Sequence, residues 1–129
     1  MIVLDTHIWI WWVQGDARLT EKYQNWLRVY ESQGLGVSII SCWEVAKLVE
    51  NNKLHLSCPV DEWLSIALAY PGIQLLNLSL TIIVDSTQLT DFHRDPSDQI
   101  IVATSRIYGC QLLTADAKIL AYPNVQTLK

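Results

Sequence analysis

Short apolar runs that alternate with longer amphipathic segments are the feature of this sequence that most constrains its fold. The chain opens on Ile2-Val3-Leu4, an apolar run that ends abruptly at Asp5-Thr6, which is typical of a buried strand followed by a turn. We expect this strand at the centre of a sheet. The remaining strands are predicted at residues 36–40, 73–76 and 111–113, with a short fifth strand at 125–127.

Helices are predicted between these strands. The apolar run from Thr6 to Val13 ends at a Gly15-Asp16 break, Ser41 resembles an N-cap with Glu44 at capping-box spacing, and Ser79 resembles another N-cap. The helical segments are expected at 6–13, 20–33, 42–51, 59–70, 79–89 and 98–108. Because strands that alternate with helices favour parallel pairing through right-handed crossovers, we predict an α/β fold with a mostly parallel sheet of about five strands.

Size and composition narrow the class of protein. The chain has 129 residues, half of them hydrophobic, which is enough for one compact core, so we expect a single domain over residues 1–129. Its apolar runs are shorter than the roughly 18 to 20 residues of a membrane span, and its opening residues lack a signal-peptide pattern. We therefore expect a cytoplasmic protein without a membrane partner. Three cysteines without ligand spacing predict free thiols.

Four acidic residues stand where such a sheet would bring them together. Asp5 and Asp116 follow the first and fourth predicted strands, Glu44 lies in the first turn of the helix after the second strand, and Asp98 begins the helix that leads into the fourth. Ligands of open parallel sheets bind beyond the carboxyl ends of the strands. Each acid alone could instead be an ordinary helix cap or turn residue, but four such coincidences at one edge are a less economical interpretation.

A cluster of this kind predicts a metal site. Carboxylates crowded within ~4 Å of one another repel by roughly 4 kcal/mol per pair at an effective dielectric near 20, so such clusters usually hold a divalent cation. Oxygen ligands favour Mg²⁺ or Mn²⁺, which would lower the pKa of a bound water and offset charge on a phosphate. The net charge of −4 argues against a protein that merely coats nucleic acid, although bound cations would cancel part of it locally.

Four segments surround these acids: Ile2-Val3-Leu4-Asp5-Thr6-His7, Ser38-Ile39-Ile40-Ser41-Cys42-Trp43-Glu44-Val45-Ala46, His93-Arg94-Asp95-Pro96-Ser97-Asp98 and Leu112-Leu113-Thr114-Ala115-Asp116. They resemble the successive motifs of PIN-domain proteins, most closely the VapC-type toxin ribonucleases, and the resemblance spans nearly the whole chain in the right order. It implies a three-layer α/β/α fold and Mg²⁺- or Mn²⁺-dependent endoribonuclease activity. It also implies an RNA substrate, a small antitoxin partner and a homodimer.

The resemblance also assigns roles to individual residues. The catalytic and metal-binding quartet matches Asp5, Glu44, Asp98 and Asp116, with Asp95 as a supporting acid and with Thr6 and Thr114 as hydroxyls that orient a carboxylate or water. One position departs from the pattern, because Gln99 stands where an Arg is usual. The loss of a positive charge there is expected to affect the level of activity more than the fold.

Several alternatives remain open at this stage. Arg94 is a candidate phosphate contact, and an exposed surface role is equally compatible with its position. Trp9, Trp11 and Trp12 could stack on bases, but filling the core or an interface is the preferred interpretation. A phosphotransferase that forms an aspartyl-phosphate on Asp5 is a rival enzyme, although His7 occupies the position of its second Asp. A PIN-like module that binds RNA or protein without catalysis is the rival from another class.

Overall fold

The computed structural model describes all 129 residues and is built on a parallel sheet with the strand order β3-β2-β1-β4. Every neighbouring pair of strands is parallel, and β1 lies inside the sheet as predicted. The strands are β1 (Ile2–Leu4), β2 (Leu35–Ser38), β3 (Ile73–Leu76) and β4 (Leu112–Leu113). The α/β class and the parallel pairing predicted from the sequence are therefore confirmed.

The sheet has four strands and not about five. The predicted strand at 125–127 forms only an isolated bridge between Thr127 and Leu112. The Leu112 N–H bonds to the Gln126 carbonyl, and the Leu112 carbonyl accepts from the Leu128 N–H. Because β4 is only two residues long, it offers too little backbone for a longer ladder on that side.

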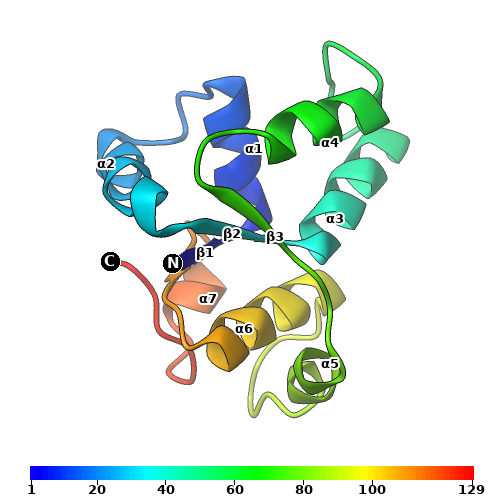
Figure 1. The fold of residues 1–129 in the computed structure, drawn as a ribbon. Coiled ribbons are helices and arrows are strands. Elements are labelled where there is room, and N and C mark those ends of the chain that lie inside the picture. The colour runs from blue at the N-terminus through cyan, green and yellow to red at the C-terminus, as the bar shows by residue number, and fades with distance from the viewer.

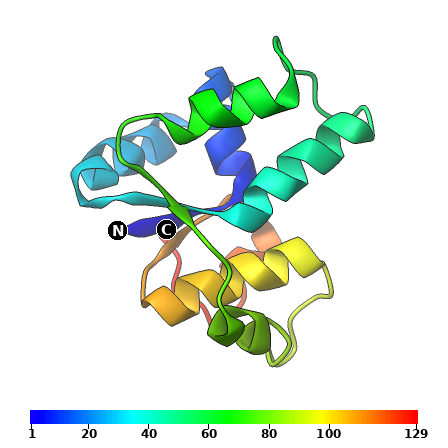
Figure 2. The ribbon, with the colours of Figure 1, turned by 45° about the vertical axis from the view of Figure 1, so that its right-hand side comes forward.

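Helices cover both faces of this sheet. Figure 1 and Figure 2 show α1 to α4 on one side of the strands and α5, α6 and α7 on the other, which gives the three-layer arrangement that the sequence motifs imply. No helix combines the length and the apolar character that a bilayer crossing requires. The helices are α1 (Thr6–Gln14), α2 (Glu21–Tyr30), α3 (Ile39–Glu50), α4 (Val60–Leu68), α5 (Leu80–Ser86), α6 (Pro96–Tyr108) and α7 (Ala117–Leu120), with a short 3-10 helix at Glu31–Gln33.

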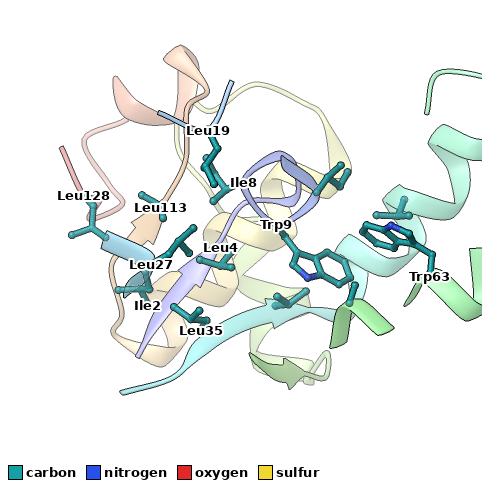
Figure 3. Packing of buried hydrophobic residues seen from close by; sticks show 14 residues of the cluster. Ile2, Leu4, Ile8, Trp9, Leu19, Leu27, Leu35, Trp63, Leu113 and Leu128 are labelled. Atoms are coloured by element: carbon teal, nitrogen blue, oxygen red, sulfur yellow. The ribbon is translucent and has the colours of Figure 1, made fainter. Parts of the chain in front are cut away.

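The core is divided by the sheet into two clusters, because successive side chains of a strand point to opposite faces. Ile2 and Leu4 pack with the larger cluster and Val3 with the smaller one. In the larger cluster Trp9 is fully buried and meets the Trp63 ring edge-on at 5.4 Å between centroids (Figure 3). Trp9 therefore fills the core, as preferred from the sequence.

The start of α3 differs from the prediction. Ile39 and Ile40 were expected to continue a strand, with Ser41 as the N-cap and Glu44 as its capping-box partner. The strand instead ends at Ser38, whose hydroxyl accepts from the Ile40 N–H, and the helix begins at Ile39. The short polar side chain of Ser38 can cap the helix locally, and this outweighs the strand preference of the two isoleucines.

The start of α6 also lies earlier than predicted. Asp95 is its N-cap and accepts from the Asp98 N–H at 3.1 Å, and Pro96 occupies the first turn. Proline suits that position because its missing N–H would have no partner there and its φ is already helical. The helix after Ser79 ends at Ser86 and not at Leu89, and the short α7 after Asp116 was not predicted.

Candidate active site

All four predicted acids lie at the carboxyl edge of the parallel sheet. Asp5 follows β1 and caps α1, while Asp116 follows β4 and caps α7. Glu44 lies on α3, which begins directly after β2, and Asp98 lies in the first turn of α6. Because α6 leads back into β4, its first turn must be at the same edge as the ends of the strands. The topology therefore gathers segments that are far apart in the sequence.

Asp5 is the buried centre of this arrangement, with an exposed fraction of 4 %. One carboxylate oxygen accepts from the Thr6 N–H at 2.8 Å, and the other accepts from the Thr114 hydroxyl at 2.7 Å. Thr114 in turn accepts from the Asp116 N–H at 3.0 Å. Burial raises the pKa of the Asp5 carboxyl, and the hydrogen bond from Thr114 opposes part of that rise.

Glu44 is held by the hydroxyl group of Thr6. The Thr6 hydroxyl donates to Glu44 Oε1 at 2.5 Å and lies 2.8 Å from the Ser41 hydroxyl. Burial raises the pKa of the Glu44 carboxyl, the bond from Thr6 lowers it, and the negative charge of Asp5 raises it again. Thr6 thus joins two acids, through its backbone N–H to Asp5 and through its hydroxyl to Glu44.

Asp98 also has a strongly perturbed carboxyl group. Its pKa rises from 3.8 to about 8, first because of burial and then because of the negative charges of Asp5, Asp95, Glu44 and Asp116. Negative charges raise the pKa of a carboxyl only when they lie close to it, so the four acids must be near Asp98. This shows that the acids predicted from the sequence, including the supporting Asp95, form one electrostatic cluster.

The chemical types of the donor atoms in the cluster suit a hard divalent cation. The donor set consists of carboxylate and hydroxyl oxygens, which Mg²⁺ and Mn²⁺ prefer, and its carboxyl groups oppose each other's ionisation, a conflict that a cation would remove. In the structure, however, no group of three or more acidic, histidine or cysteine side chains has the arrangement of a formed metal site. Side-chain rotations would be required before these residues could coordinate a common ion.

Two neighbours of the cluster were not among the site residues predicted from the sequence. Ser41 had been interpreted as an N-cap and instead contacts Thr6, whereas His93 places its Nε2 atom 3.1 Å from Asp98 Oδ2. The spacing of Ser41, one helical turn before Glu44, was a usable signal. His93 lies in a loop without periodicity, so only its place in the motif around Asp98 pointed to it.

Arg94, the candidate phosphate contact, and Gln99, which departs from the family pattern, have different environments. Arg94 is exposed, so its substrate-binding role stays a prediction. Gln99, which stands at the position where the resemblance implies an arginine, donates from Nε2 to the His93 carbonyl at 3.2 Å. Its amide therefore braces the loop before α6.

Comparison with protein families and curated proteins finds relatives over nearly the whole chain. The model of the PIN domain matches residues 2–125. Ribonuclease VapC22 of Mycobacterium tuberculosis is 26% identical over 122 residues, which cover 94% of this chain and 91% of that protein.

Solved structures share the fold at lower sequence identity. VapBC2 from Rickettsia felis, crystallised with a DNA fragment from its promoter, has a chain with a TM-score of 0.73 at 18% identity, and 99% of this chain and 98% of that chain are covered. A toxin-antitoxin complex from Klebsiella pneumoniae has a chain with a TM-score of 0.68 at 20% identity, with 98% and 97% covered. These likenesses concern the fold alone.

Proposed function

Since the chain belongs to the PIN-domain family, we propose that it is a Mg²⁺- or Mn²⁺-dependent endoribonuclease that hydrolyses RNA phosphodiester bonds in the cytoplasm. The resemblance drawn from its sequence motifs is confirmed. The observation that supports the activity is the position of the four acids at the carboxyl edge of the parallel sheet, where such sheets bind ligands. The similarity to a curated ribonuclease supports the same reaction.

In this proposal each residue of the cluster has a distinct task. Asp5, Glu44, Asp98 and Asp116 hold the ion, which supplies Lewis acidity towards water and the phosphate. Thr6 keeps Glu44 and Asp5 in place, with bonds of 2.5 Å and 2.8 Å. Asp95 supports the site indirectly, because as N-cap it fixes the backbone of the turn that carries Asp98.

Two further tasks concern the substrate and the buried carboxylate. Thr114 orients Asp5 through its hydroxyl. The exposed side chain of Arg94 contacts the RNA backbone.

We further propose that the protein is the toxin of a type II toxin-antitoxin pair, that a small antitoxin inhibits it, and that it forms a homodimer. Chains of the same fold occur in a toxin-antitoxin complex from Klebsiella pneumoniae and in a crystal structure of DNA-bound VapBC from Salmonella typhimurium. An antitoxin would stop the reaction without disturbing the fold if it covered the carboxyl edge of the sheet.

The test compares cleavage of structured RNAs by the purified, antitoxin-free chain with and without Mn²⁺. Asp5→Asn and Asp98→Asn preserve side-chain shape and remove one carboxylate each, so both should lose cleavage by at least about two orders of magnitude. Asp61→Asn, on the exposed start of α4, is the matched control and should cleave normally. Cleavage that persists in EDTA or in both site variants contradicts the proposal.

A non-catalytic RNA- or protein-binding module is the second candidate, and one observation favours it: no coordination set is formed in the structure. Thermal unfolding separates the two functions. A cation present at 100 times its dissociation constant adds roughly 2.7 kcal/mol to the free energy of unfolding. For a domain of this size that corresponds to a rise in Tm of about 10 °C. An unchanged Tm in millimolar Mn²⁺, together with RNA binding without cleavage, would favour the binding module.

A further inference from the structure

His93 approaches the candidate site from outside the acidic quartet. Its Nε2 atom is buried and lies 3.1 Å from Asp98 Oδ2, a hydrogen-bonding distance, yet the two groups are not aligned as a hydrogen bond and Nε2 has no other partner. A terminal carboxylate rotates about its last bond at little cost. A donor within reach of a rotatable acceptor is therefore already in place beside a proposed metal ligand.

The loop that carries His93 is held at several points, so this approach is not the accident of a free side chain. The Phe92 ring packs between the rings of His93 and Tyr122, with centroid separations of 4.4 Å and 4.7 Å. The Tyr122 hydroxyl donates to the Thr90 carbonyl at 2.8 Å, which ties the start of the loop to the segment after α7.

The end of the same loop is tied to α6. Gln99 donates from its side-chain amide to the His93 carbonyl at 3.2 Å, and it stands on the same first turn as Asp98. The His93 imidazole and the Asp98 carboxylate that it faces are therefore both positioned by α6. An exchange of Gln99 for arginine, the residue that the sequence resemblance implies here, would replace this amide by a longer charged group.

We propose that His93 is a positioning residue for Asp98, which donates an N–H from Nε2 to one carboxylate oxygen and leaves the other oxygen free for the divalent cation, and that Gln99 holds His93 in that place. The inference rests on the proposed metal-dependent function. Carboxylates that bind metals are usually hydrogen-bonded by an outer group, and the loss of such a group costs about 10- to 100-fold in metal affinity or activity. No proton transfer by His93 is involved.

Mn²⁺ binding to the full, RNA-free chain tests this role, with unbound Mn²⁺ measured by electron paramagnetic resonance. His93→Phe keeps a ring against Phe92 but has no N–H, and should weaken Mn²⁺ affinity about 10- to 100-fold. His93→Gln supplies an amide donor of similar reach and should stay within about threefold of the wild type. His55→Phe, an exposed histidine before α4, is the control and should bind normally.

The possible outcomes distinguish a failure of the proposed metal-dependent function from a failure of the role proposed for His93. A wild-type chain that binds no Mn²⁺ overturns the proposed function and the inference with it. Wild-type binding that is unchanged in His93→Phe overturns the inference alone. Equal losses in the Phe and Gln variants also overturn it, because the imidazole itself would then be required.

Gln99→Leu provides a second variant if His93→Phe does not fold, as judged by circular dichroism. It should weaken Mn²⁺ affinity about 3- to 10-fold, less than the loss of the donor itself. An unchanged affinity overturns the role of Gln99 as support.

Kinetics distinguish positioning from direct participation in the reaction. If His93 acts through Asp98, saturating Mn²⁺ should restore the kcat of His93→Phe to within a few-fold of the wild type. A kcat that remains low at saturation would place His93 in the chemistry and refute the positioning role.

Discussion

The replacement Asp98→Asn should stabilise the metal-free protein at alkaline pH although it removes a proposed ligand. The pKa of this carboxyl rises from 3.8 to about 8 because the group is buried and because four other acids face it. Asparagine has nearly the same shape, carries no charge, and keeps an oxygen within reach of His93 Nε2. Stabilisation by the loss of a functional group is expected where a site stores unfavourable electrostatic energy.

The sign of the pH dependence follows from proton linkage. Between pH 3.8 and about 8 the folded chain retains a proton on Asp98 that the unfolded chain has released. The free energy of unfolding therefore falls as pH rises through this window, by at most about 1.4 kcal/mol per pH unit. Over the whole window this amounts to roughly 6 kcal/mol, and partial solvent screening reduces the expected contribution to about 2 to 3 kcal/mol.

Urea unfolding of the wild type and Asp98→Asn in EDTA, at pH 5 and pH 9, measures this effect. The two proteins should differ little at pH 5, where the wild-type carboxyl is protonated, and by about 2 to 3 kcal/mol in favour of the variant at pH 9. Asp61→Asn should show the wild-type pH dependence. The reasoning is refuted if Asp98→Asn is no more stable than the wild type at pH 9.

Three further predictions concern the core, a turn and a cap. Trp63→Ala removes the ring packed on the buried tryptophan of α1 and should cost about 3 to 5 kcal/mol in urea unfolding, whereas Trp43→Ala, 51 % exposed, should cost under about 1 kcal/mol. Gly72→Ala should destabilise by about 2 kcal/mol or more, since φ is +84° and a Cβ would lie 2.7 Å from the Glu31 carbonyl oxygen. Asp116→Asn should keep the N-cap of α7 and the stability of the protein while it weakens Mn²⁺ binding. Asp116→Ala should lose the cap as well as Mn²⁺ binding, and calorimetry should show a free energy of unfolding lower by about 1 kcal/mol.

Much of the fold could be predicted because the strands carry an unambiguous pattern. Ile2-Val3-Leu4 is too short for a helix and too apolar for a loop, and the polar Asp5 after it marks the sheet edge. The boundaries at Ser38 and Asp95 were harder. In both places a side chain caps the helix earlier than the apolar pattern indicates, and such a local hydrogen bond leaves little trace in periodicity.

The site shows the same division between what topology determines and what packing determines. Parallel crossovers bring Asp5, Glu44, Asp98 and Asp116 to one edge, and this follows from the order of strands and helices alone. The contact between His93 and Asp98 depends instead on how one loop packs on Tyr122 and on Gln99. No spacing rule relates these residues, so the sequence did not predict that contact.

The structural and functional explanations of the acids turn out to be compatible. Asp5, Asp95 and Asp116 are all N-caps, although the plain interpretation had suggested a cap for Asp5 and only a turn residue for Asp116. An N-cap carboxylate is aimed at free backbone N–H groups where a helix begins. In a parallel sheet the helices begin beyond the carboxyl ends of the strands. A fold that caps such helices with aspartate therefore gathers carboxylates at one edge without further design, and Glu44 and Asp98 need only complete a cluster that the caps have begun.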